Sequence, residues 1–394
     1  MTSKAKVRTG LDRLVAEGFA SLRGRRLGFV VHPASRDARL KRGWCLAHAS
    51  AMADVCALFG PQHGFLGQTQ DNMIEWEGFT DRTTGLPVYS LYGEVRKPTA
   101  AMLQDVDTLV VDLQDVGARY YTFIWTLYLC LEACAELGKS VVVLDRPNPL
   151  GGEVVEGPVL DPAYASFVGL APIPVRHGLT IGELALLFRH WQGWDLDLDV
   201  VWMQGWRRGM DFEATGLPWV LPSPNMPTVE TAFVYPGGCL LEGTNLSEGR
   251  GTTRPFEIFG APWIDPDTLV GLLRHWNLPG VVWRPLVFEP TFHKFAGQPC
   301  GGVQVHVTDR LAFSPVLTYT AAIAAVRELW PHRFAWREPP YEYETVKLPI
   351  DILAGGPRWR RMLEADRRLP ALQAAWQQEC DGFTGRTLEF RHYD

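Results

Sequence analysis

The chain has 394 residues, which is enough for a large buried core and, at roughly 150 residues per domain, for two domains. Hydrophobic residues make up 46% and charged residues 21% of the sequence, as in ordinary globular proteins, which argues against disorder. The formal net charge is −6, which gives no sign of the basic surface that binds nucleic acids, so we expect no nucleic-acid partner.

The sequence carries no visible targeting or membrane segment. Residues 1–24 mix charged and polar residues and lack the apolar core of a signal peptide. No window of about 18 residues is apolar throughout, so we expect no membrane insertion. The seven cysteines are predicted to be buried free thiols, which favours a reducing compartment. We therefore predict a cytoplasmic monomer or homodimer, or a periplasmic or secreted protein if a leader has been removed.

The first half of the chain alternates apolar runs with helix-length segments. Continuous Val- and Leu-rich runs predict buried strands at residues 26–31, 53–59, 108–113, 140–145 and 196–203. Residues 120–137 and 180–193 predict helices, the first ended by Gly138 and the second begun by a capping box of Thr180 and Glu183. Strand, helix and strand with short joins indicate a parallel sheet of the α/β class.

The second half of the chain predicts a smaller domain of mixed secondary structure. Residues 219–262 are rich in Pro, Gly, Asn and Thr and predict a long irregular loop, a kind of segment that is usually functional. Strands are expected at residues 281–288 and 302–308, and a helix at 313–329. We predict a Rossmann-like α/β domain over residues 1–205 and a smaller α+β domain over residues 206–394 that closes the active-site cleft.

Polar side chains follow the predicted strands at the point where each strand ends. They are His32 and Ser35; Gln62 and His63; Gln114, Asp115 and Arg119; and Asp145, Arg146 and Asn148. Ligands of open parallel sheets bind beyond the carboxyl ends of the strands. We therefore expect these side chains to converge at one edge of the sheet.

The sequence lacks the motifs of the common cofactor and metal sites. Residues 249–254 miss the third glycine of a dinucleotide fingerprint and do not follow a strand. There is no P-loop, no GxSxG nucleophile elbow and no HExxH zinc motif. His177 and His190 have no carboxylate at ligand spacing. We expect a protein without cofactor or metal.

Several motifs, all in one order, resemble a known family. They are residues 59–64 (FGPQHG), 112–122 (DLQDVGARYYT), 144–149 (LDRPNP), 223–227 (SPNMP), 242–255 (EGTNLSEGRGTTRP) and 300–309 (CGGVQVHVTD). Together they are similar to the exo-β-N-acetylmuramidases of bacterial cell-wall turnover. The resemblance implies a Rossmann-like first domain, a smaller second domain and a cleft between them for the terminal sugar. It also implies a glycoside hydrolase that releases terminal N-acetylmuramic acid from peptidoglycan fragments.

One position departs from the family pattern. The family usually has Glu where this chain has Gln62, and that glutamate is a leading candidate for the catalytic carboxylate in relatives. A glutamine amide neither donates nor accepts a proton at useful pH. Either Glu75 or Glu77 supplies the missing carboxylate, or the activity is altered.

Glycoside hydrolysis needs an acid for the leaving oxygen and a carboxylate that activates water or attacks the anomeric carbon. The candidate carboxylates are Glu75, Asp112, Asp115, Asp145, Glu242 and Glu248. Of these we predict Glu75, Asp115 and Glu248 to be catalytic, with His63 in proton transfer or sugar contact. Capping, or pairing with Arg119 or Arg146, is the alternative for Asp112 and Asp145.

The sugar itself suggests the binding residues. Arg119, Arg176 and Arg250 suit the lactyl carboxylate of muramic acid, because a guanidinium forms two hydrogen bonds with a carboxylate. N-acetylglucosamine lacks this group, so such an Arg would give selectivity. The other predicted sugar contacts are Gln62, Gln114, Tyr120, Tyr121, Asn148, His177, Asn225 and Asn245. Packing is the alternative for the two tyrosines and Asn225.

Three functions stay open at this point. The first is the exo-acting muramidase, either with direct displacement or with attack by the acetamido group of the substrate on its own anomeric carbon. The second is a non-catalytic protein that binds muropeptides, which is suggested by Gln62 in place of the usual Glu. The third is a hydrolase of another acidic sugar.

Overall fold

The computed structural model describes residues 7–71, 73–365 and 369–394. Its N-terminal part is built on a seven-stranded sheet, in the order β3-β4-β2-β1-β5-β6-β9. The strands are β1 (Arg26–Val31), β2 (Asp54–Gly60), β3 (Phe79–Thr80), β4 (Pro87–Ser90), β5 (Thr108–Asp112), β6 (Ser140–Leu144) and β9 (Leu198–Val201). Each neighbouring pair is parallel except β3 with β4.

The predicted parallel sheet is confirmed, and its sequence explains it. Residues alternate between the two faces of each strand, so Val30 packs on one side while Phe29 and Val31 pack on the other. Both faces are covered, which is why these strands are continuous apolar runs. The sequence analysis did not predict β3 and β4, because β3 has only two residues and both are exposed.

Helices cover both faces of the sheet. On one face lie α1 (Gly10–Ala16) and α2 (Gly43–His48), whose Leu11 and Trp44 share a core with Phe29. On the other lie α3 (Phe123–Leu137) and α4 (Ile181–Gln192). The predicted ends hold: Gly138 caps α3 at φ 62°, and Thr180 and Glu183 form the capping box of α4.

The C-terminal part is mixed α+β, as predicted. Its three-stranded antiparallel sheet has the order β10-β12-β11, with β10 (Ile258–Ala261), β11 (Val281–Phe288) and β12 (Cys300–Val307). Its helices are α5 (Phe212–Thr215), α6 (Val229–Gly238), α7 (Pro266–His275), α8 (Pro315–Leu329), α9 (Pro349–Ala354), α10 (Arg358–Glu364) and α11 (Leu369–Thr387). The 3-10 turns of the chain are η1 (Ala20–Leu22), η2 (Pro162–Tyr164), η3 (Cys239–Gly243) and η4 (Leu388–Phe390).

The expectation of a long irregular loop over residues 219–262 is wrong. This segment contains α6, η3 and β10. The end of α6 was not predicted because it consists of Pro236, Gly237 and Gly238, which are poor helix formers. Gly237 is needed for close packing, since a Cβ there would lie 2.0 Å from the Pro315 carbonyl oxygen at the start of α8.

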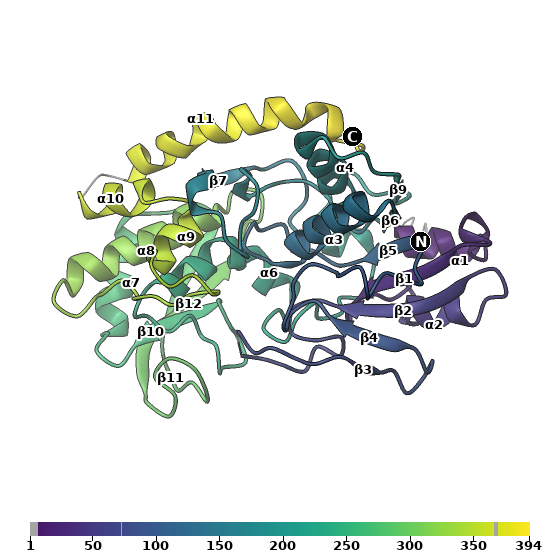
Figure 1. The fold of residues 1–394 in the computed structure, drawn as a ribbon. Coiled ribbons are helices and arrows are strands. Elements are labelled where there is room, and N and C mark those ends of the chain that lie inside the picture. The colour runs from purple at the N-terminus through teal and green to yellow at the C-terminus, as the bar shows by residue number, and fades with distance from the viewer. Residues whose placement is uncertain (1–6, 72, 366–368) are drawn as a thin grey trace, which may run out of the picture.

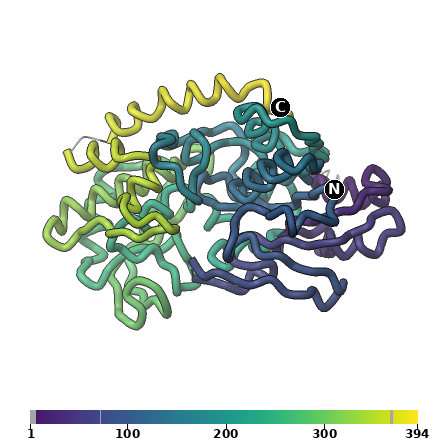
Figure 2. The backbone as a smooth tube through the Cα atoms, viewed as in Figure 1, coloured from purple at the N-terminus to yellow at the C-terminus, as the bar shows by residue number. Residues whose placement is uncertain are grey.

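Two long-range elements tie the parts of the molecule together. The hairpin of β7 (Glu156–Val159) and β8 (Pro174–Arg176) lies beneath α11, and Val159 N donates a 3.1 Å hydrogen bond to Glu379 of that helix. Figure 1 and Figure 2 show α11 running from α10 across the molecule to α4. The boundary at residues 205 and 206 stays a prediction. No helix in the described part of the chain combines the length and apolar character needed to cross a membrane.

Candidate active site

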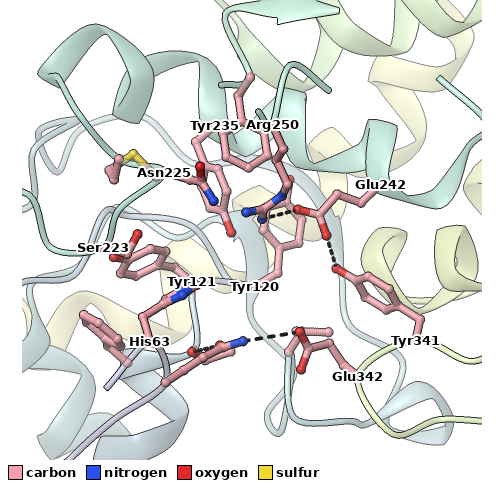
Figure 3. Close-up of a pocket in the computed structure, with 16 residues that line it drawn as sticks. His63, Tyr120, Tyr121, Ser223, Asn225, Tyr235, Glu242, Arg250, Tyr341 and Glu342 are labelled. Atoms are coloured by element: carbon pink, nitrogen blue, oxygen red, sulfur yellow. Dashed lines mark hydrogen bonds and ion pairs between the residues drawn. The ribbon is translucent and has the colours of Figure 1, made fainter. Parts of the chain in front are cut away.

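A cavity of about 460 Å³ lies where loops from both parts of the chain meet. It is lined by Gln62, His63, Tyr120, Tyr121, Thr122, Phe123, Val168, Ser223, Asn225, Met226, Tyr235, Glu242, Arg250, Phe256, Tyr341 and Glu342 (Figure 3). Gln62 and His63 follow β2, and residues 120–122 follow the β5 end, so the predicted carboxyl edge of the sheet supplies one wall.

Gln62 and Glu342 form one side of the cavity. The Thr122 hydroxyl donates a 2.6 Å hydrogen bond to Gln62 Oε1, which turns the amide nitrogen toward Glu342 Oε1 at 3.4 Å. The Tyr92 hydroxyl donates to the other oxygen of Glu342 at 3.0 Å. Burial raises the pKa of Glu342 to about 7, against the opposing effect of the Tyr92 hydrogen bond. A carboxyl group that holds its proton near neutral pH is therefore present beside the glutamine.

The opposite side of the cavity is a buried charge cluster centred on Arg250. Arg250 Nη2 donates to Glu242 Oε1 at 2.8 Å, and the Tyr341 hydroxyl donates to Glu242 Oε2, also at 2.8 Å. The other amino nitrogen of Arg250, Nη1, is buried and has no hydrogen-bond partner among the described residues. Burial opposes the charge, but the flanking carboxylates raise the pKa of Arg250 above its usual value. The cavity therefore contains a cation with an unused donor.

Glu248 lies behind Arg250 and does not line the cavity. Its carboxylate is fully buried and is paired with Lys294 Nζ at 2.9 Å, His293 Nδ1 at 3.1 Å and Arg250 Nε at 3.4 Å. Burial by itself raises the pKa of Glu248, but these three neighbours together hold it well below its ordinary value. The structure thus gives Glu248 the position of a permanent counter-charge.

His63 lines the cavity in a defined tautomer. Its backbone has a φ of 68°, and Nδ1 lies 2.9 Å from the Thr69 carbonyl oxygen, so Nδ1 carries the proton that it donates there. Burial lowers the pKa of His63 to about 4. The ring is therefore neutral at pH 7 and offers Nε2 as an acceptor for a sugar hydroxyl, not as an acid.

Aromatic and amide groups complete the wall. The rings of Tyr120 and Tyr121 each meet Tyr235 edge to face, with centroids 5.6 Å and 5.8 Å apart. Asn225 is fixed by Gln70, whose backbone oxygen accepts from its Nδ2 at 2.6 Å. These groups are rigid before any ligand arrives, which favours tight recognition.

Of the predicted site residues, Gln62, His63, Tyr120, Tyr121, Asn225 and Arg250 line the cavity. The remaining ones do not line it, and most of them bond neighbouring loops instead. Asp115 accepts from Gly117 N at 2.7 Å and pairs with His177 Nε2 at 3.2 Å, beneath the turn that leads to α3. Gln114 donates to the carbonyls of Asp115 and Pro147, each at 2.8 Å.

Arg119 and Arg176 also form hydrogen bonds with the backbone of nearby segments. Arg119 is fully buried and donates to the carbonyl oxygens of Pro158, Ile173 and Leu353 at 2.7 to 2.8 Å. Burial lowers the pKa of Arg119 to about 10. Arg176 Nη2 donates to the Leu150 carbonyl oxygen at 2.7 Å. Neither Arg119 nor Arg176 lines the cavity, and Nε of each is buried without a hydrogen-bond partner among the described residues.

Two further predicted residues lie outside the cavity. Asn245 exchanges hydrogen bonds with Arg333 O at 2.8 Å and Ala335 N at 3.0 Å. Glu75 is half-exposed, with an ion pair to Arg96 at 3.1 Å and a 3.1 Å hydrogen bond from the Tyr343 hydroxyl. Glu75 therefore lies on the far side of Tyr343 from the cavity.

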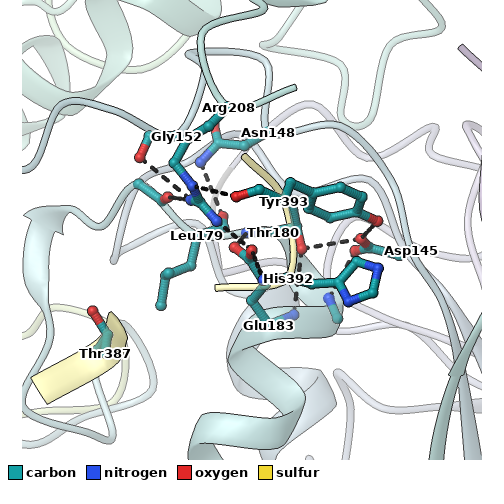
Figure 4. A network of polar contacts seen from close by, with 12 residues as sticks. Asp145, Asn148, Gly152, Leu179, Thr180, Glu183, Arg208, Thr387, His392 and Tyr393 are labelled. Carbon is teal, nitrogen blue, oxygen red and sulfur yellow. Dashed lines mark hydrogen bonds and ion pairs between the residues drawn. The ribbon is translucent and has the colours of Figure 1, made fainter. Parts of the chain in front are cut away.

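Asp112, Asp145 and Asn148 complete the group, and the predicted pairing of Asp112 with Arg146 is confirmed. Arg146 Nε and Nη2 lie 2.6 and 2.9 Å from the two Asp112 oxygens. Asp145 receives hydrogen bonds from Thr180, Gly182 and the C-terminal Tyr393 (Figure 4), and burial raises its pKa to about 7. Asn148 bridges Leu179 O and Leu150 N.

The contact between Tyr393 and Asp145 gives a stability prediction. Tyr393→Phe removes the hydroxyl that donates to Asp145 at 2.5 Å and accepts from Met203 N at 2.8 Å. We expect a loss of about 1 to 3 kcal/mol in the free energy of unfolding, measured by denaturant titration. Tyr89→Phe is the control, since the Tyr89 hydroxyl makes no hydrogen bond within the described parts of the chain. Equal stability of Tyr393→Phe and Tyr89→Phe would contradict the stabilising role of the Tyr393 hydroxyl.

The sequence analysis missed Glu342, Tyr341, Tyr235, Ser223 and Thr122 as cavity residues. Glu342 carries the strongest signal that was available: it follows a Pro-Pro pair within the sequence PPYEYE. Glu342 and Tyr343 both adopt positive φ, 44° and 68°, which is costly for residues with a side chain. Backbone strain of this kind is concentrated at functional sites.

Comparison with known proteins gives a consistent result. Family models described as the N-terminal and C-terminal parts of exo-beta-N-acetylmuramidase NamZ match residues 27–230 and 233–393. The peptidoglycan beta-N-acetylmuramidase NamZ of Bacillus subtilis (strain 168) is 50% identical over 331 residues, which are 84% of this chain and 80% of that protein.

Solved structures agree with this match. One crystal structure of a DUF1343 family protein from Bacteroides fragilis has a TM-score of 0.89 and 35% identity, with 100% of both chains covered. A second DUF1343 family protein of that organism has a TM-score of 0.76 and 28% identity, with 99% of both chains covered. The predicted α/β fold is confirmed, and the chain belongs to the exo-β-N-acetylmuramidase family.

Proposed function

We propose that this protein is an exo-acting glycoside hydrolase that removes terminal N-acetylmuramic acid from peptidoglycan fragments. The proposal is supported by family membership and by a cavity of about 460 Å³ built from both parts of the chain. Its walls carry two carboxyl groups, Glu242 and Glu342, which glycoside hydrolysis uses.

The observation that carries the proposal is the unused donor of Arg250. Arg250 lines the cavity, its Nη1 is buried with no hydrogen-bond partner among the described residues, and an unpartnered buried donor is unfavourable until a ligand binds it. The lactyl carboxylate of muramic acid is an acceptor of matching charge. N-acetylglucosamine has only a neutral hydroxyl at that position, a weaker acceptor than a carboxylate, so we expect selectivity for muramic acid.

The chemistry follows from the groups that face the sugar. The buried carboxyl of Glu342 is protonated below about pH 7 and is an acid for the leaving oxygen. The reaction then proceeds by direct displacement or through the acetamido group of the substrate. NMR of the anomer that is released first separates inversion from retention of configuration.

The activity test compares substrates that differ only in the lactyl group. We expect release of a chromogenic phenol from its β-N-acetylmuramide but not from the matching glucosaminide. Conversion of the lactyl carboxylate to its amide should lower kcat/KM by about 10- to 100-fold, because the charged hydrogen bond to Arg250 is lost. Absence of turnover at every pH between about 4 and 9 would reject the proposal.

A second candidate function is a non-catalytic protein that binds muropeptides. The reason to consider this function is Gln62, an amide in the cavity wall where the family usually has Glu. Calorimetric binding of muramic acid without turnover, together with activity gained by Gln62→Glu, would favour it. A hydrolase of another acidic sugar is tested in the same series with uronic-acid glycosides.

The cytoplasmic location and the state of assembly are further proposals. All seven cysteines lie in the described residues and are free thiols, which fits a reducing compartment. Cell fractionation tests the location, and light scattering distinguishes a monomer from a homodimer.

A further inference from the structure

An outer groove adjoins the cavity of the candidate active site. It has a volume of about 670 Å³ and is lined by Arg96, Ala165, Ser166, Phe167, Glu342, Tyr343 and Glu344. Among the lining residues of the two hollows, Glu342 is the one that they share. Tyr341 lines only the cavity and Tyr343 only the outer groove. Glu342 therefore stands at the junction between the two hollows.

The backbone holds this junction in place. Residues 342 and 343 both have positive φ, which directs successive side chains to different hollows. The turn is closed by two 2.9 Å hydrogen bonds between the backbone groups of Tyr341 and Glu344. Glu342 N also contacts Met73 Sδ at 3.2 Å. The strained conformation is thus fixed from several directions.

The outer groove has the surface of a sugar subsite. The ring of Tyr343 is 49% exposed, and the Arg96 guanidinium lies 4.0 Å from its centroid. Glu75 fixes both groups by accepting 3.1 Å hydrogen bonds from Arg96 Nη2 and from the Tyr343 hydroxyl. A rigid, half-exposed aromatic ring offers an apolar face to a pyranose, and neighbouring polar groups such as Ser166 meet its hydroxyls.

We propose, building on the proposed function, that the outer groove binds the sugar that leaves and that Glu342 donates the proton to its glycosidic oxygen. The bond from the anomeric carbon to that oxygen breaks, and its electron pair stays on the oxygen as the Glu342 proton arrives. Water adds its hydroxyl to the anomeric carbon, and its remaining proton restores the carboxyl group. One water is consumed, and two free sugars result.

The surroundings of Glu342 fit this role. Each oxygen of Glu342 accepts one hydrogen bond, Oε2 from the Tyr92 hydroxyl at 3.0 Å and Oε1 from Gln62 at 3.4 Å, and the longer contact makes Oε1 the better placed oxygen to carry the proton. The Gln62 amide beside Oε1 is a neutral neighbour, oriented by Thr122. Burial keeps the carboxyl protonated near neutral pH.

The first test varies the leaving group in a Glu342→Gln variant. With a GlcNAc leaving group we expect kcat/KM to fall by about 10²- to 10⁴-fold, because no proton is supplied. With an acidic nitrophenol, which departs without protonation, the fall should stay below about tenfold. Glu94→Gln, an exposed carboxyl outside both hollows, is the matched control. Calorimetry with muramic acid verifies that the variant still binds.

The second test addresses the outer groove. Tyr343→Ala should raise KM about tenfold for the disaccharide MurNAc-GlcNAc and leave the methyl muramide unaffected, because a methyl group does not fill the groove. Tyr343→Phe keeps the ring and should retain the wild-type KM. A loss of kcat with both substrates would point to a structural role and overturn the subsite.

The outcomes separate this inference from the proposed function. If the wild-type protein hydrolyses no muramide, the proposed function fails. If the wild-type protein is active but Glu342→Gln loses the same factor with every leaving group, or loses nothing, Glu342 is not the acid. A leaving-group dependence that appears in Glu75→Gln instead would transfer the role to Glu75 and overturn the assignment.

Discussion

Arg250→Met should lower the free energy of unfolding by about 3 to 5 kcal/mol. Arg250 lies between Glu242 and Glu248, residues that are 1% and 0% exposed, and methionine leaves both carboxylates buried without this cation. Methionine matches the apolar part of the Arg250 side chain, whose guanidinium lies near the Phe256 ring. The loss in the free energy of unfolding therefore measures mainly the effect of removing the charge. Denaturant titration monitored by tryptophan fluorescence gives the value.

The double variant Glu242→Gln with Arg250→Met isolates the coupling between the two groups. We expect it to be more stable, by about 1 kcal/mol or more, than the sum of the single losses predicts. Arg310→Met is the surface control. Arg310 also contacts three carboxylates, those of Asp211, Glu213 and Glu230, but it is 24% exposed and should lose less than about 1 kcal/mol. Equal losses at the two positions would contradict the buried-cluster interpretation.

The same cluster sets a pH dependence of stability. Lys294, His293 and Arg250 hold the pKa of Glu248 below its unfolded value of about 4.3. Glu248 therefore stabilises the folded state above that pH, and its contribution is lost as the pH falls. In Arg250→Met the pKa of Glu248 should rise, so the loss of stability on acidification should begin at a higher pH.

Gln62→Glu should extend the activity of the enzyme to higher pH. In the wild type we expect kcat/KM to fall about tenfold per pH unit above about 7, because burial raises the pKa of the Glu342 acid to about 7 and its proton is lost there. A second carboxyl at position 62 would lie about 3.4 Å from Glu342 Oε1. Two carboxyls so close share one proton, which raises the pH at which that proton is lost.

We expect the alkaline limb of the pH profile to move up by at least about one unit in this variant. Glu242 raises the pKa of Glu342 and Arg250 lowers it, Arg96 and Glu344 line the outer groove with it, and the substitution changes none of these four groups. Tyr92→Phe serves as the comparison. It removes a hydrogen bond that lowers the pKa of Glu342, so it should move the limb in the same direction by a smaller amount. An alkaline limb that stays near pH 7 in both variants would mean that another group titrates there.

Much of the scaffold was predictable because its causes are local. The Val- and Leu-rich runs of β1, β5 and β6 are buried on both faces, and a run of that kind has few alternatives to a parallel strand. The capping box of Thr180 and Glu183 set the start of α4 within four residues of sequence. The family motifs also marked Gln62, His63, Tyr120 and Arg250, which all line the cavity.

The sequence by itself determined the parallel sheet, the helix ends and the edge of the sheet that lines the cavity. The tertiary structure decided which polar residues of that edge face the cavity. Asp115 and Arg119 were reasonable candidates by residue type. In the folded protein, however, they form hydrogen bonds with backbone N–H and C=O groups of the nearby loops, which need partners because they are buried. Glu342 comes to Gln62 from 280 residues away, a proximity that no local pattern encodes because chain folding creates it.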